Sequence, residues 1–155
     1  MAVIANTILV VRRIAELQRR RQMLVERQER VRRSLPEWAF TPLQLVGMSA
    51  EEIRATMNEL ARAEDEAGLS EMEQEIERID RQIEDLENSL LATPARSLDA
   101  IQAILELAVS RFREQTATDP DDVFYDYGDA RILFLLERAT GDLRALLAEH
   151  ERAAS

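Results

Sequence analysis

Arginine is the residue type in this chain with the clearest capacity for binding chemistry. Arg12 and Arg13 form one cluster near the start of the chain, and Arg19, Arg20 and Arg21 form a second one a few residues on. Guanidinium groups bind phosphates and carboxylates through paired hydrogen bonds. The two clusters therefore predict contact with a nucleic acid, with a partner protein, or with acidic helices of the same chain.

Nucleic-acid binding is the less favoured of these interpretations. Phosphates prefer an arginine stripe of this kind, but no aromatic side chains are interleaved with the clusters for base stacking. The chain carries 30 acidic and 20 basic residues, a net charge of −10, and its acidic part would repel phosphates. We favour ion pairing inside the chain or with a protein partner. An arginine-helix binder, or an acidic inhibitor that mimics a nucleic-acid surface, is the alternative.

The apolar connector over residues 35–48 is a second candidate for partner binding. It holds Trp38 and Phe40 between two prolines. The simpler interpretation is a loop folded over the end of a helical bundle. The alternative is an anchor for a partner, since tryptophan is enriched at the hot spots of protein interfaces.

The sequence offers few residues that could carry out catalysis or bind a metal. Cysteine is absent and His150 is the single histidine, which excludes thiolate zinc sites and di-iron sites that need two histidines. The acidic run from Asp119 to Asp122 lacks the glycine and glutamate positions of a calcium loop. We expect no catalytic residue, no metal site and no cofactor, and hence a protein that is not an enzyme.

The backbone that carries these residues is expected to be all-α. Four glycines and four prolines are too few for the frequent turns of a β protein, and apolar residues recur at helical spacing. The first helix is expected over about residues 7–34. Its heptad seam is Val10, Ile14, Leu17, Arg21, Leu24, Gln28, Val31 and Leu35.

Two further helices are expected over about residues 50–67 and 70–91. Ser49 and Glu52 form a capping box at the start of the first, and Gly68 is the expected break between them. The helix over 70–91 has a heptad seam in which every position is large and apolar. That seam is Leu69, Met72, Ile76, Ile79, Ile83, Leu86 and Leu90.

Charge complementarity predicts how the long helices associate. Residues 1–34 carry a net charge of +6 and residues 70–90 a net charge of −6. Oppositely charged heptad helices of matched length are expected to pair, with apolar seams supplying stability and charges selecting the partner. The sequence thus predicts an elongated coiled-coil helical hairpin over 1–92, and its connector permits either parallel or antiparallel pairing.

Residues 93–155 are expected to form a separate C-terminal two-helix hairpin, whose first helix is capped by Ser97. One apolar face is expected on each helix, and that of the closing helix is expected to point inward. These faces are Leu98, Ile101, Leu105, Ala108 and Phe112 in the first helix, and Ile132, Leu136, Ala139, Leu143 and Leu147 in the second.

Part of the chain, residues 69–148, resembles a loose group of small uncharacterised bacterial helical proteins. The resemblance is carried by the acidic heptad helix from Ile79 to Leu91, by the boundary from Thr93 to Leu98 (Thr-Pro-Ala-Arg-Ser-Leu), and by the closing stretch from Leu136 to Leu146. Thr140-Gly141 departs from the alanine-rich form of that stretch. The resemblance implies a helical accessory protein, often found on mobile elements, and it implies no activity.

The sequence as a whole predicts a non-enzymatic protein–protein interaction module. A dimer or other homo-oligomer is expected, because polar seam residues and two long helices favour it. No apolar run approaches the 18 residues that a membrane span needs, and no signal peptide is apparent at the N-terminus. The expected location is the cytoplasm.

Overall fold

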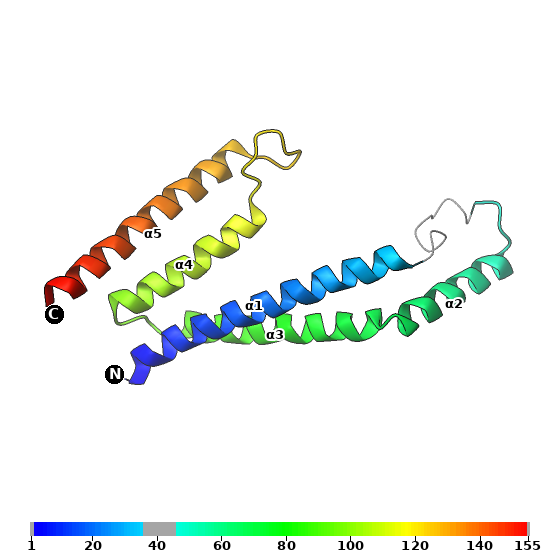
Figure 1. Cartoon of the computed structure of the whole chain (residues 1–155), viewed down its shortest axis with the longest axis horizontal. Coiled ribbons are helices and arrows are strands. Elements are labelled where there is room, and N and C mark those ends of the chain that lie inside the picture. Colours follow the sequence, from blue (N-terminus) through cyan, green and yellow to red (C-terminus); the bar gives the residue numbers. More distant parts are fainter. Residues whose placement is uncertain (1, 36–45, 155) are drawn as a thin grey trace. The chain divides into compact units, whose positions relative to one another are not determined.

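The structure is a computed structural model that describes residues 2–35 and 46–154 (Figure 1). The described residues are 83% helical and form five helices and no strand, which confirms the all-α fold. An isolated bridge joins Ala117 to Tyr125 in the turn before the last helix. The helices are α1 (Ala2–Ser34), α2 (Ala50–Glu66), α3 (Leu69–Ala92), α4 (Leu98–Gln115) and α5 (Tyr127–Ala154).

The chain divides into two compact units. One unit is Glu16–Asp85, and the other combines Met1–Ala15 with Leu86–Ser155. The division follows contacts rather than chain order, because α1 and α3 each contribute to both units.

In the Glu16–Asp85 unit, α1 and α3 are joined by their charges and run antiparallel. Arg32 pairs with Glu73 near the start of α3, whereas Arg21 pairs with Asp80 further along it. A later residue of α1 thus meets an earlier residue of α3, and Figure 1 shows the two helices running in opposite directions. The first helix begins at Ala2, five residues before the expected start.

The heptad seams of these two helices are covered. Every seam position from Leu17 to Leu35 and from Leu69 to Ile83 is buried or partly buried. Ile79 is 2% exposed and Leu17 3% exposed. Burying such side chains contributes roughly 1.5–3 kcal/mol each, so the apolar seams supply most of the stability of this unit.

The short helix α2 depends on its cap, because none of its residues is buried. The Ser49 hydroxyl accepts a hydrogen bond from the Glu52 backbone N–H, and the Ser49 N–H donates to the Glu52 carboxylate at 2.7 Å. The predicted capping box is therefore confirmed. Gly68 ends the helix with a φ of +73°, in the left-handed region that glycine adopts without strain.

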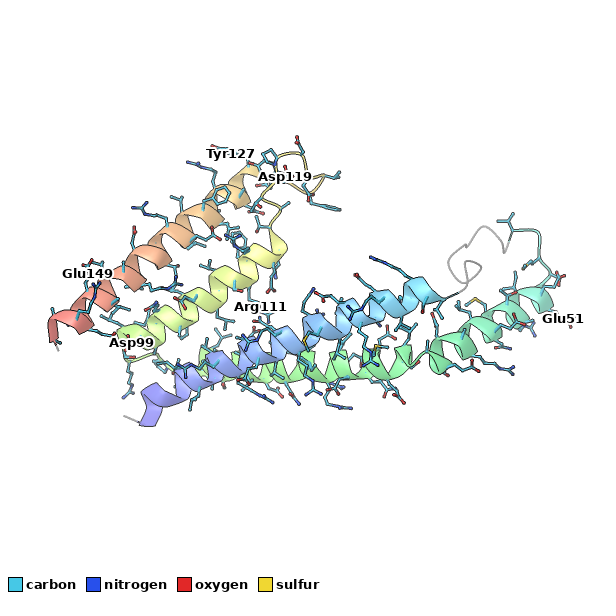
Figure 2. The ribbon with its side chains drawn as sticks, in the orientation of Figure 1. Glu51, Asp99, Arg111, Asp119, Tyr127 and Glu149 are labelled. Atoms are coloured by element: carbon cyan, nitrogen blue, oxygen red, sulfur yellow. The ribbon has the colours of Figure 1, made fainter. Side chains whose placement is uncertain are left out.

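In the second unit, α4 and α5 run antiparallel. Arg113 near the end of α4 pairs with Glu137, and Glu106 near its middle pairs with Arg144. Figure 2 shows Asp99 and Glu149 at one end of this helix pair and Asp119 and Tyr127 at the other. The expected N-cap is confirmed, since the Ser97 hydroxyl accepts from the Ala100 N–H at 3.1 Å.

The expected inward face of α5 is wrong. The buried positions of α5 are Ala130, Leu133 and Thr140, whereas Ile132 is 50% exposed and Leu136 38% exposed. The helix is rotated by about one residue from the expected orientation, since successive residues lie about 100° apart around a helix. The apolar stripe of α5 therefore does not point at α4.

Candidate interaction surfaces

Two arginines of the α1 clusters form ion pairs with acidic residues of the same chain. The Arg20 Nη2 atom lies 2.6 Å from a Glu75 carboxylate oxygen, and the Arg21 Nε donates to Asp80 at 2.6 Å. Arg12, Arg13 and Arg19 are exposed. Trp38 and Phe40, the other expected partner-binding residues, lie outside the described residues.

A shallow surface of α1 combines apolar and basic side chains. Its centre is Met23, which is 64% exposed, and a hollow of about 360 Å³ surrounds it. Because positions 20, 23, 27 and 30 are spaced by three and four residues, they lie on one face of the helix. We call this surface the arginine face; its hollow is lined by Arg20, Met23, Leu24, Glu26, Arg27 and Arg30.

The contact between α4 and α5 is polar at its centre. Glu106 accepts hydrogen bonds from the Arg144 Nε at 2.9 Å and from the Gln102 side-chain amide at 2.9 Å. Burial disfavours the charged form of Glu106, but the Gln102 and Arg144 hydrogen bonds and the Arg144 charge together outweigh it, so the pKa of Glu106 lies below its ordinary value. The carboxylate is therefore ionised at neutral pH and forms an ion pair that joins α4 to α5.

A cavity of about 360 Å³ opens between the Glu106–Arg144 and Arg113–Glu137 ion pairs. Its wall includes Ser110, Thr140 and Gly141. The Thr140 hydroxyl donates to the Leu136 carbonyl oxygen at 2.6 Å, so it serves the helix backbone. Around this cavity, small side chains and ion pairs separate α4 and α5, whereas the apolar burial of α5 lies at Ala130 and Leu133, nearer the turn.

The acidic turn before α5 has a local structural role. The Asp119 carboxylate accepts from the Asp121 N–H at 3.0 Å, and the Asp122 carboxylate accepts from the Phe124 N–H at 2.8 Å. These bonds shape the turn. Across residues 2–35 and 46–154, no three His, Asp or Glu side chains gather in a way that could hold a metal ion.

The apolar stripes of α4 and α5 turn to one side of the helix pair. Leu105 and Phe112 directly precede Glu106 and Arg113, the α4 residues that meet α5. In the same way, Leu136 and Leu143 directly precede Glu137 and Arg144 on α5. Each apolar stripe thus lies about 100° back from the contact line of its own helix. Since the helices are antiparallel, equal backward rotations turn both stripes to the same side.

This surface, the apolar face, is substantially open to solvent. Leu98 is 59% exposed, Ile101 41% and Ile132 50%. No charged residue falls within either stripe, and positions 108 and 139 between the larger side chains are alanines. The apolar face consists of Leu98, Ile101, Leu105 and Phe112 on α4, with Ile132, Leu136, Leu143 and Leu147 on α5.

Sequence reasoning found the members of both stripes but not their placement. It missed Glu106, Arg113, Glu137 and Arg144 as the residues that join α4 to α5. A signal was present, because each follows directly after a stripe residue and each helix carries one acid and one arginine at the same spacing, which antiparallel pairing sets against each other.

Comparison with protein-family models, with curated proteins and with solved structures gave no match to this chain. Within the described part of the chain, no helix combines the length and apolar content that a membrane crossing requires.

Proposed function

We propose that the protein is a non-enzymatic helical module that binds other protein chains through exposed apolar helix surfaces. The observation that carries this proposal is the apolar face of α4 and α5. Exposed contiguous apolar patches of this kind mark interaction sites in soluble proteins, and the Ile132 side chain at 50% exposure has room for a partner. An accessory or regulatory role, as the resemblance of residues 69–148 implies, fits such a module.

The rest of the molecule has a supporting part in this proposal. The antiparallel ion pairs between α1 and α3, together with their covered seams, support an elongated coiled-coil hairpin as a structural arm. The α4–α5 pair forms the C-terminal hairpin that presents the binding surface. A cytoplasmic, acidic adaptor is the cellular form that we propose.

Partner capture with matched variants tests the proposal. Tagged full-length protein is incubated with lysate of the source organism, alongside Ile132→Glu and Phe134→Glu variants. Residues 132 and 134 lie about 200° apart on α5 and are similarly exposed, at 50% and 45%. We expect captured proteins to be lost with Ile132→Glu and retained with Phe134→Glu. Equal capture by both variants would refute the apolar face as the binding surface.

Nucleic-acid binding is the second candidate, and the arginine face favours it. Arg19, Arg27 and Arg30 are exposed on α1. The acidic residues of α3 form ion pairs with Arg20, Arg21 and Arg32. A gel-shift titration with duplex DNA and with RNA at about 50 mM salt, where phosphate contacts are strong, separates the two functions. Binding that weakens steeply with salt and is reduced by Arg27→Gln and Arg30→Gln would favour the second candidate.

A further inference from the structure

We propose that the apolar face of α4 and α5 docks against the same face of a second copy of this chain, forming a four-helix bundle across a two-fold axis. The inference rests on the proposed function and names its partner. It starts from the two stripes that turn to one side of the helix pair and remain open there, with Leu98 59% exposed and Ile101 41% exposed.

The size of the apolar face suits a dimer. The 18 residues of α4 give a length of about 27 Å at 1.5 Å per residue. Two neighbouring helices spaced by 8–10 Å give a width of roughly 20 Å. Each copy therefore offers on the order of 500 Å², and two copies bury about 1,000 Å² in total, which reaches the lower limit for a specific interface.

The charge distribution favours a second copy over a charged partner. A chain with a net charge of −10 repels its own copies, so self-association needs a surface from which acidic residues are missing. The apolar face meets this condition. The neighbouring charges are already neutralised inside the chain, Glu106 by Arg144 and Glu137 by Arg113. A basic or acidic partner would find no complementary charge within the face.

The spacing of the stripes also fits helix–helix packing. On α4 the positions 98, 101, 105, 108 and 112 repeat at intervals of three and four residues, the pattern that packs side chains of one helix between those of another. Within the chain this pattern is not used against α5, because α5 contacts the Glu106 and Arg113 side of α4. A second helix pair laid on the face would use both stripes at once.

Light scattering of full-length protein over a range of concentrations tests the dimer. We expect a dimer for the unaltered chain and for Phe134→Glu, the control on the other side of α5. Ile132→Glu places a carboxylate in the apolar face and is expected to weaken dimerisation by about a hundredfold, since an unpaired buried charge is strongly disfavoured. Circular dichroism of each variant checks that helix content is unchanged.

A labelling experiment keeps the test valid if Ile132→Glu fails to fold. The chain has no cysteine, so Ala139→Cys and Ala145→Cys each introduce one thiol on α5. Both alanines are exposed, but residue 139 lies in the stripe and residue 145 about 120° away from it. We expect maleimide labelling of Ala139→Cys to slow by about tenfold as the protein is concentrated and the dimer forms. Labelling of Ala145→Cys is expected to stay constant.

Three results would overturn the inference: a monomer at tens of micromolar, a dimer that Ile132→Glu leaves intact, or equal labelling of the two cysteines at all concentrations. Each of these results would exclude the dimer without excluding the proposed protein-binding function. A monomer that still captures a protein through Ile132, and loses it with Ile132→Glu, retains the interaction module while excluding the second copy as its partner.

Discussion

The two antiparallel helix pairs use similar residues in opposite places. Where α1 meets α3, the heptad seams are covered and exposed ion pairs such as Arg32–Glu73 lie beside them. Where α4 meets α5, ion pairs such as Glu106–Arg144 lie at the contact, and the apolar stripes turn outward together. The α1–α3 arrangement covers its own seams within one chain. The second leaves apolar area available, which is the physical basis of the proposed interaction surface.

The largest expected effect separates covered from open isoleucines. Ile79 on α3 is 2% exposed and Ile132 on α5 is 50% exposed. Ile79→Ala removes buried methyl groups and leaves a cavity, so we expect a loss of about 2–5 kcal/mol in the free energy of unfolding. Ile132→Ala in dilute protein is expected to change it by less than about 0.5 kcal/mol. Urea unfolding followed by circular dichroism measures both.

Equal losses for these two alanine variants would remove the distinction between the helix pairs. Repeating the Ile132→Ala measurement at high protein concentration sharpens the distinction, since the proposed dimer would bury residue 132 between two copies and make its truncation costly.

A smaller effect is expected at the cap of α2. Ser49→Ala removes the acceptor for the Glu52 N–H, and loss of such a cap costs about 1 kcal/mol. Because α2 has no buried residue, the loss is expected to be local. Hydrogen exchange of the α2 amides should speed up while that of α3 is unchanged. Ser89→Ala is the control, since the Ser89 hydroxyl bonds within α3 to the Leu86 carbonyl oxygen.

The smallest effect is expected at the ion pair between α4 and α5. The side chains of Arg144 and Glu106 are 63% and 37% exposed, so solvent screens them and Glu106→Gln is expected to cost about 0.5 kcal/mol at neutral pH. The pKa of Glu106 lies below its ordinary value of 4.5 in the folded chain. Its contribution is therefore present above pH 4.5 and is lost as the pH falls through the lower, folded pKa.

Urea unfolding of Glu106→Gln at neutral and at acidic pH tests this sign. The difference in unfolding free energy between the variant and the unaltered chain should shrink in acid, where Glu106 is protonated and, like the glutamine that replaces it, uncharged. Glu114→Gln on the same helix is the control, and its effect on unfolding should be near zero at both pH values. A difference that grows in acid would contradict the assignment of Glu106 as a helix-joining carboxylate.

Local signals in the sequence predicted the elements well. The caps at Ser49 and Ser97 and the break at Gly68 stand where the sequence placed them, because capping depends on residues within one turn. The seam of α3 was likewise recognisable, since an unbroken apolar heptad must be covered to be stable. The seam of α1 was recognisable from its spacing, although Arg21 and Gln28 interrupt its apolar residues.

The sequence did not predict in the same way which side of α4 contacts which side of α5. An apolar stripe shows that a helix face avoids water, but it does not say which surface covers it. Leu136 and Glu137 are neighbours in the sequence, and a rotation of about 100° decides which of them meets α4. The choice depends on how four charged side chains match across two helices, and this match exists only after the chain has folded.

The left-handed conformation of Gly68 has a consequence for the geometry of the chain. Its φ of +73° separates α2 from α3, which would otherwise form one uninterrupted rod from residue 50 to residue 92. A Cβ at this position would meet no atom within 4 Å, so an alanine would be opposed by backbone torsion alone. The φ angle of this one residue therefore sets the direction in which the chain continues from α2 into α3, its most acidic helix.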